Sequence, residues 1–172
     1  MNTSKLTSSD YFKGLSIVYY SLILGVLIFL LIALFINYTK NISKIDAVFS
    51  NAITIAFFVF LIVGLAGSHL FFSGKLKKIN SLNKDLLIKT AEYRSSLIVR
   101  YAFIEGSAFF SIIGFLLTGS NTFIVFVGIP IIILLALRPS KERLINDLQL
   151  AATEKGKIYD PNAIISEILL RV

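Results

Sequence analysis

The chain has 172 residues, of which 56% are hydrophobic and 16% are charged. A typical soluble domain contains about 45–50% apolar and about 25% charged residues, so the composition excludes an ordinary water-soluble globule. The absence of cysteine excludes disulfides and thiolate metal sites, and a single histidine, His69, cannot form a histidine metal cluster. We therefore expect an integral membrane protein with no metal and no cofactor.

Four apolar segments are long enough to be considered as membrane spans, and they cover residues 14–36, 47–72, 96–118 and 122–137. The first exceeds the length of a signal-peptide core, so we interpret it as a retained span. The fourth is the shortest, about 24 Å as a helix, and it contains Gly128 and Pro130. A full crossing and a re-entrant segment both remain open for it, and the short link at residues 119–121 favours a crossing in a helical hairpin.

The net charge of +7 is explained by basic residues in cytoplasmic loops and near anionic lipid headgroups, so we expect no nucleic-acid partner. With four crossings and both termini inside, fourteen Lys and Arg residues lie on the cytoplasmic side, and only Lys40 and Lys44 lie outside. This bias predicts an inner (plasma) membrane protein whose N- and C-termini are both cytoplasmic.

Residues 73–95 are polar but carry an apolar stripe at helical spacing: Leu76, Ile79, Leu82, Leu86 and Tyr93. The stripe predicts a cytoplasmic helical hairpin that prolongs spans two and three, with a bend at Gly74 or at residues 80–81. The alternative is a helix that lies on the lipid headgroups.

The tail, residues 139–172, is predicted to form two short amphipathic helices. Pro139 and Ser140 would start the first helix, which Gly156 would end, and Asp160 with Pro161 would start the second. We expect this tail to pack under the bundle, on the membrane surface or on a partner. The predicted fold is therefore all-α: a four-helix membrane bundle over residues 1–138 with amphipathic cytoplasmic helices.

Glu105 is the main candidate for a functional side chain. It lies about nine residues into span three, roughly 13 Å from its cytoplasmic end, where a carboxyl must be protonated, paired or next to a water-filled cavity. Arg100 lies nearer the boundary, where its long side chain can snorkel to lipid phosphate or water. Counting residues along spans one and two places Tyr20, Ser21 and His69 at depths similar to those of Glu105 and Arg100. These residues are therefore candidate members of an ion-binding or buried polar site.

A row of small and hydroxyl residues follows span three, and a shorter row follows span two. Such rows allow helices to pack closely in lipid, where apolar association has little driving force. We interpret them as helix-packing faces, with a polar conduit as the alternative. The residues are Ser107, Ser111, Gly114 and Thr118 in span three, and Gly64 and Ser68 in span two.

Residues 100–110, RYAFIEGSAFF, resemble the carboxylate helix of the rotor-ring c subunits of ATP synthases. In that family the carboxylate binds the transported proton or sodium ion, so the resemblance implies that Glu105 takes up an ion. The chain departs from the family in having four spans instead of two, no repeated Gly-x-Gly pattern in span two and no Arg-Gln-Pro turn.

The spans contain no pair of spaced carboxylates, and the sequence contains no histidine-rich cluster, nucleophile elbow or phosphate-binding loop, so we expect no enzymatic activity. The leading hypothesis is a small inner-membrane protein that acts as a structural, assembly or accessory subunit, as a homo-oligomer or in a larger membrane complex. The alternative is a proton- or cation-coupled transporter or channel subunit that uses Glu105.

Overall fold

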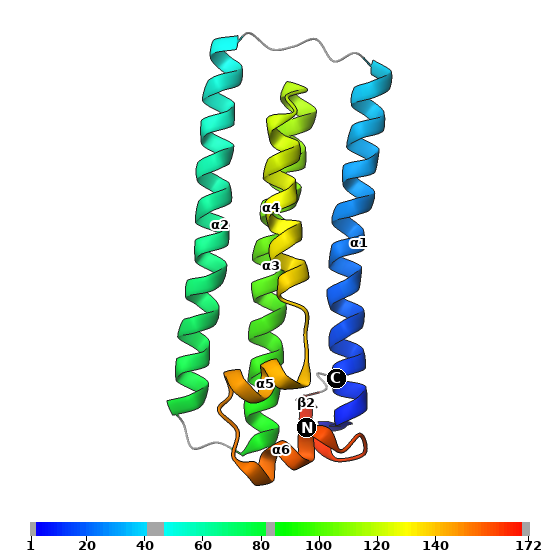
Figure 1. Cartoon of the computed structure of the whole chain (residues 1–172), viewed down its shortest axis with the longest axis vertical. Helices are drawn as coiled ribbons and strands as arrows, with labels where there is room; N and C mark the ends of the chain where they lie inside the picture. Colours follow the sequence, from blue (N-terminus) through cyan, green and yellow to red (C-terminus); the bar gives the residue numbers. More distant parts are fainter. Residues whose placement is uncertain (1–2, 41–46, 82–84, 170–172) are drawn as a thin grey trace. The chain divides into compact units, whose positions relative to one another are not determined.

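The computed structural model of the chain describes residues 3–40, 47–81 and 85–169. Over these residues the chain is almost entirely helical, which confirms the helical prediction, and one short strand lies near each end (Figure 1). The helices are α1 (Ser8–Lys40), α2 (Ala47–Ser81), α3 (Leu86–Thr118), α4 (Thr122–Ala136), α5 (Lys141–Asp147) and α6 (Ala152–Tyr159). The strands are β1 (Thr3–Thr7) and β2 (Ile164–Leu169).

Three helices, α1, α2 and α3, are long and apolar enough to cross a membrane, and α4 together with α5 is a fourth, bent candidate. α1, α2 and α3 contain 33, 35 and 33 residues, which is about 50 Å of helix each. The hydrocarbon core of a bilayer is only about 30 Å thick, so each of these helices is long enough to extend well beyond it. These three to four candidate spans support a membrane protein.

The chain divides into two compact units, and α1, α2 and α3 each contribute to both. The terminal unit consists of Met1–Tyr19, Leu70–Val99 and Arg138–Val172. The apolar unit consists of Tyr20–His69 and Arg100–Leu137.

Three of the basic residues that were counted to predict the membrane orientation lie outside the described residues. They are Lys44, Lys84 and Arg171.

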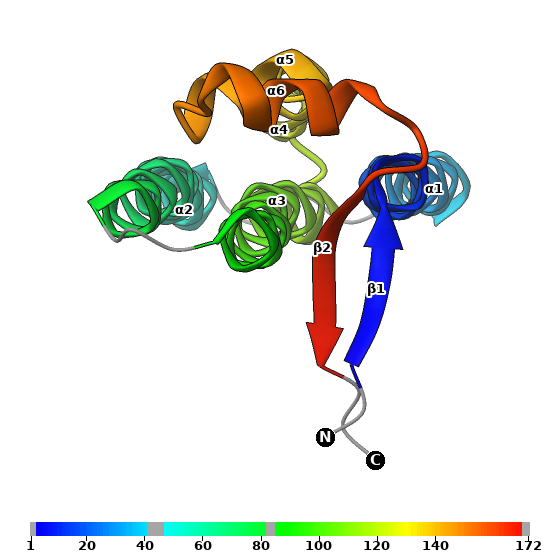
Figure 2. The ribbon, with the colours of Figure 1, turned by 90° about the horizontal axis from the view of Figure 1, so that it is seen from below.

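In the terminal unit, β1 and β2 pair as an antiparallel ribbon (Figure 2). Lys5 is opposite Glu167 and Leu6 is opposite Ser166, with an irregularity between Leu6 and Thr7. The prediction of a second tail helix after Pro161 is therefore wrong, because these residues form a turn and then a strand.

The turn before β2 explains the difference. Asp160 does not cap a helix; its Oδ1 accepts a hydrogen bond from the Asn162 amide (3.0 Å), which closes a turn instead. The first amides of α1 then bind this turn: Ser8 N donates to Ala163 O (2.9 Å) and Ser9 N donates to Pro161 O (3.1 Å). Because a helix leaves its first amides without partners inside the helix, the turn also caps α1.

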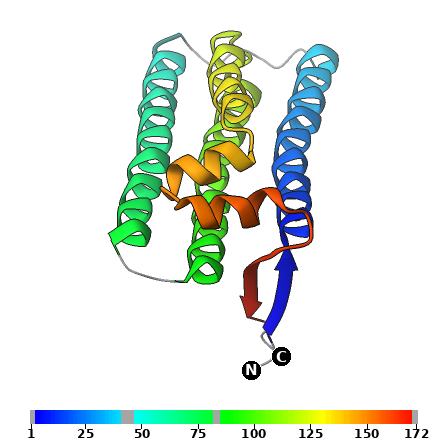
Figure 3. The same ribbon diagram turned by 60° about the horizontal axis from the view of Figure 1, so that its bottom comes forward.

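α5 begins as predicted, because Ser140 Oγ accepts a hydrogen bond from the Arg143 amide (3.1 Å). The helix ends earlier than predicted, at Asp147 rather than at Gly156. Gln149 adopts a left-handed backbone conformation (φ 50°), which separates α5 from α6. At the start of α6, the Ala151 amide donates to Glu154 Oε2 (3.0 Å). Gly156 lies inside α6, and α5 and α6 lie next to one another (Figure 3).

The tail packs within the terminal unit. α5, α6 and the loop between them bury five of their aliphatic side chains: Leu144, Ile145, Leu148, Leu150 and Ile158. Hydrogen bonds join the tail to α1 and α3, with Ser8 Oγ donating to Ile158 O (2.6 Å) and Thr90 Oγ1 donating to Ile165 O. These five side chains of the tail are therefore buried against the chain itself.

The end of α2 and the start of α3 also belong to the terminal unit. α2 continues through Gly74, which is therefore not a bend, and it ends at Ser81; residues 82–84, which follow it, lie outside the described residues. Ile79, Leu86 and Tyr93, three residues of the apolar stripe, are buried, Leu76 is half-buried, and Leu82 lies outside the described residues. Phe72 and Tyr93 are in edge-to-face contact, with ring centroids 5.8 Å apart, and so hold α2 against α3.

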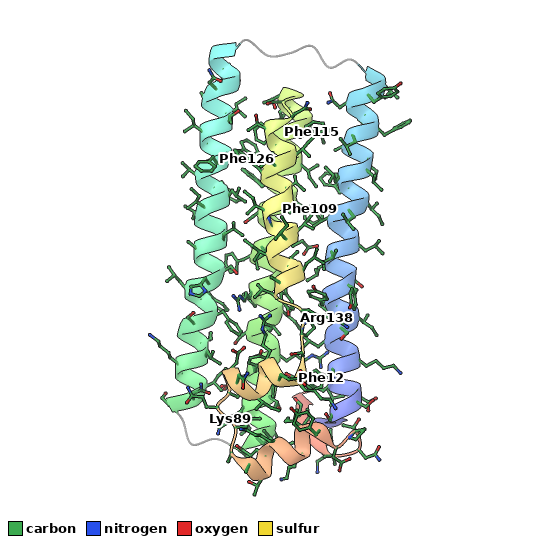
Figure 4. All side chains as sticks on the ribbon, in the orientation of Figure 1. Phe12, Lys89, Phe109, Phe115, Phe126 and Arg138 are labelled. Atoms are coloured by element: carbon green, nitrogen blue, oxygen red, sulfur yellow. The ribbon has the colours of Figure 1, made fainter. Side chains whose placement is uncertain are left out.

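The apolar unit has one core to which all four of its helices contribute. The buried members are Val26 and Ala33 of α1, Leu61 of α2, Ala108, Ile112 and Phe115 of α3, and Phe123, Phe126 and Val127 of α4. Phenylalanine rings fill much of this core, and Figure 4 labels Phe109, Phe115 and Phe126. Phe57 of α2 joins the helices, since its ring stacks on Phe110 of α3 (4.5 Å) and meets Phe123 of α4 edge-on (5.5 Å).

Candidate functional site

The small residues of α2 lie against α3. A methyl group at Gly64 would overlap Ser107 Oγ and would stand 3.5 Å from Ser107 Cβ, so only a glycine fits there without a shift. One turn further along α2, the buried Ser68 Oγ donates to Arg100 O (3.3 Å). The structure therefore brings Gly64 and Ser68 together with α3 in one helix contact.

The hydroxyl groups in the row on α3 bond to their own helix. Ser107, Ser111 and Thr118 donate to the carbonyl four residues earlier, at 2.9, 2.8 and 2.8 Å, and all three side chains are buried. Because each hydroxyl group donates its hydrogen bond within α3, the row provides small side chains for helix packing and not a series of free hydrogen-bond donors.

Gly114 makes room for α4. A methyl group there would lie 2.9 Å from Phe123 Cζ and closer still to two other ring atoms. Phe123 is fully buried, and its position in the core requires the missing side chain at Gly114. At the other end of α4, Tyr101 of α3 donates to Leu137 O (2.8 Å) and so satisfies a carbonyl at the helix end.

Glu105 lies on α3 at the edge of the contact with α1. It is half-buried, and a methyl group at Gly25 of α1 would stand 3.7 Å from Glu105 Oε1 and 3.9 Å from Phe109 Cζ. Within the part of the chain that the structure describes, no side chain or amide donates a hydrogen bond to this carboxyl, and no cation forms an ion pair with it. The carboxyl therefore lies close to the α1 backbone at Gly25, where an added methyl group would be in ordinary van der Waals contact with it.

The other candidate residues are not gathered around Glu105. Tyr20 is 50% exposed and Ser21 is exposed, one to two helical turns before Gly25 on α1. His69 is exposed on α2, and Arg100 is half-buried, with its carbonyl accepting from Ser68. The residue of α1 that meets the carboxyl is therefore Gly25, which depth matching alone did not identify.

Two small residues on the exposed face of α3 also escaped the sequence reasoning. Ala102 and Gly106 are four residues apart and both exposed, and an added methyl group at Gly106 would meet nothing within 4 Å. Their spacing is the small-x-x-x-small pattern by which transmembrane helices approach closely, and the pattern is readable in the sequence. Glu105 stands beside this face.

A second polar cluster, in the terminal unit, was also missed. Asp147 at the end of α5 accepts from Tyr93 of α3 through its carboxylate (2.8 Å) and from Asn80 of α2 through its carbonyl (2.9 Å). These bonds attach the tail to α2 and α3, and we assign them a structural role. Across residues 3–40, 47–81 and 85–169, no group of three or more His, Cys, Asp or Glu side chains could hold a metal ion.

Comparison with protein-family models, with curated proteins and with solved structures finds no match for this chain, so its function has to be argued from the residues and their geometry.

Proposed function

We propose that this chain is a small multi-pass inner-membrane protein that acts as a structural, assembly or accessory subunit and has no enzymatic activity. One observation carries the proposal. Glu105 is an ionisable side chain in an apolar helix to which the described residues offer no hydrogen-bond donor. A carboxyl without a partner is costly inside a membrane, about 2.5–3.5 kcal/mol for charged residues on insertion scales, so a group from outside the chain is the natural partner.

The proposed fold is a four-helix membrane bundle. The terminal unit contains the start of α1, the end of α2, the start of α3 and the tail after α4. If this unit lies on one side of a membrane, α1 must leave that side and α2 must return, and α3 and α4 must do the same. The pairing of β1 with β2 also requires both strands to lie on the same side of the membrane. The chain between them must therefore cross the membrane an even number of times.

The charge distribution supports a cytoplasmic terminal unit. Fourteen of the seventeen lysines and arginines belong to the sequence ranges of this unit, and three belong to those of the apolar unit. By the positive-inside rule, both termini are then cytoplasmic.

The exposed face of α3 is the surface through which we propose association. Ala102 and Gly106 would allow a second transmembrane helix to approach closely, and Glu105 beside them would gain a hydrogen-bond partner from it. The partner is either a second copy of this chain or another membrane subunit. Each hydrogen bond between transmembrane helices contributes about 0.6–2 kcal/mol, so the carboxyl adds to close packing without replacing it.

Photo-crosslinking in native membranes tests this proposal. Benzoylphenylalanine at Phe103 of α3 probes the association face, and the same residue at Phe58 of α2 is a matched control, since both side chains are 45% exposed. We expect a discrete higher-mass adduct from position 103 and none from position 58. The adduct should weaken with Gly106→Leu and persist with the control Gly67→Leu. Monomer alone from both probes would contradict the proposal.

The alternative is a proton- or cation-coupled transporter or channel subunit in which Glu105 binds the ion while Arg100 and His69 tune its affinity. The half-buried position of the carboxyl against Gly25, where α1 carries no side chain, favours it. In sealed vesicles it predicts that Glu105→Gln abolishes a flux without loss of helical content. A flux that persists in this variant would exclude Glu105 as the ion carrier.

A further inference from the structure

We infer that four basic side chains of the terminal unit form a binding surface for the phosphates of anionic glycerophospholipids. They are Lys13 of α1, Lys75 of α2, Arg94 of α3 and Arg138, which lies two residues after the end of α4 and is labelled in Figure 4. We call this set the basic girdle. The inference does not depend on the association proposed above.

Contacts between the helices bring three members of the girdle to similar levels. Tyr11 of α1 donates to Thr90 O of α3 (3.0 Å), and a methyl group at Gly14 would stand 3.3 Å from Arg94 Nη2. Lys13, next to Gly14, is therefore level with Arg94. On α2, Phe72 contacts Tyr93, the residue before Arg94. Lys75, three residues after Phe72, therefore lies within about one helical turn of the level of Arg94.

Two of the girdle side chains are held by aromatic rings. Lys75 lies one turn beyond Phe71, away from the apolar part of α2, and its Nζ is 5.8 Å from the centroid of the Phe71 ring, so the ammonium group folds back toward the apolar part of the helix. The Arg94 guanidinium is 6.0 Å from the Tyr11 ring centroid. Aromatic side chains beside basic residues are typical of the boundary between hydrocarbon and headgroups.

The described residues give the girdle no anionic partner. In the described ranges, no carboxylate forms an ion pair with Lys13, Lys75, Arg94 or Arg138. Lys13, Lys75 and Arg138 are exposed and Arg94 is half-buried. Four cations without counter-charges from the described residues, three of them at similar levels on α1, α2 and α3, offer electrostatic sites for anions.

Exposed apolar side chains next to the girdle identify the anion as a lipid. Ile17 lies one turn from Lys13 on α1 and is 61% exposed, and Leu70 lies on α2, on the apolar side of Lys75, and is 70% exposed. On α1 and on α2, an exposed apolar side chain thus lies within two turns of an exposed cation. A phospholipid satisfies both, with acyl chains against Ile17 and Leu70 and the phosphate at the cations, whereas a soluble phosphate satisfies only the second.

The test compares two triple variants of the full chain. The girdle variant carries Lys13→Gln, Lys75→Gln and Arg138→Gln, and leaves Arg94 in place because it packs on Tyr11. The control carries Lys5→Gln, Lys155→Gln and Lys157→Gln, three exposed lysines from β1 and α6. Both variants lose the same net charge. Retention of phosphatidylglycerol over phosphatidylcholine is measured by native mass spectrometry of the detergent-solubilised protein.

Each basic residue near an anionic surface strengthens attachment about fivefold, so the girdle variant should lose roughly a hundredfold in phosphatidylglycerol affinity, and the control should retain its preference. An equal loss in both variants, or no loss in the girdle variant, would overturn the inference. Displacement of the lipid by millimolar inorganic phosphate would also overturn it, because that outcome indicates a soluble-anion site.

A measurement on the unmodified protein covers the case in which the girdle variant does not fold. Spin-labelled phosphatidylglycerol and spin-labelled phosphatidylcholine are compared in vesicles that contain the wild-type chain. We expect a larger motionally restricted fraction for phosphatidylglycerol, which high salt reduces by screening. Equal fractions for the two lipids would refute the girdle.

Discussion

The contact between Gly64 and Ser107 gives the sharpest prediction for the packing of the apolar unit. In Gly64→Ala, the new methyl group overlaps Ser107 Oγ and stands 3.5 Å from Ser107 Cβ and 3.9 Å from Phe103 O. The backbone and Cβ distances are ordinary contacts, so the hydroxyl alone has to move. It can move only by breaking its hydrogen bond to Phe103 O (2.9 Å).

The free energy of unfolding should fall by about 2 kcal/mol. Overpacking costs about 1–3 kcal/mol and the lost hydrogen bond about 0.5–1.5 kcal/mol, and the better helix propensity of alanine returns up to about 1 kcal/mol. In Gly64→Ala with Ser107→Ala the overlapping atom is gone. The double variant should therefore recover most of the loss, with a coupling energy of about 1.5–2 kcal/mol in the double-mutant cycle.

Reversible unfolding in mixed detergent micelles, followed by far-ultraviolet circular dichroism, measures these differences. Gly67→Ala on the same helix is the control, because its methyl group would meet nothing within 4 Å, and it should be neutral or slightly stabilising. If Gly64→Ala is as stable as Gly67→Ala, or if Ser107→Ala does not rescue it, the close contact of α2 with α3 is not as described.

Three further stability predictions use the same unfolding assay. Gly114→Ala should cost about 2–3 kcal/mol because its methyl group meets the Phe123 ring, and Phe123→Leu should rescue part of the loss, which a steric origin requires. Tyr93→Phe removes the hydrogen bond to Asp147 and should cost about 1–3 kcal/mol, whereas a neutral result would mean that this bond does not hold the tail. Ser140→Ala removes the cap of α5 and should cost about 1 kcal/mol, with Ser140→Asp restoring stability if capping is the cause.

Much of the fold was predictable because its signals are local. Long apolar segments predict α1, α2 and α3, and the sequence at Pro139 and Ser140 predicts the start of α5. The β1–β2 ribbon was not predictable in this way, because Leu6 and Ser166 pair although they are far apart in sequence. The isoleucines at 164, 165 and 168 also fit a helix, and only the partner strand decides between the two structures.

The candidate site was predictable in composition but not in arrangement. The depth of Glu105 and the small residues around Ser107 can be read from helical spacing. That Gly25 lies opposite the carboxyl depends on how α1 is registered and rotated against α3 within the apolar unit. No local sequence signal encodes such a contact.

Both proposals require four crossings with the terminal unit in the cytoplasm, and labelling of single cysteines in intact cells tests this requirement most directly. The chain contains no cysteine, so Asn121→Cys in the link before α4 and Gly156→Cys in α6 each give one exposed thiol. A membrane-impermeant maleimide should label position 121 in intact cells and position 156 only after permeabilisation. Labelling of both positions from the same side would mean that α4 does not cross, and would contradict the four-span account.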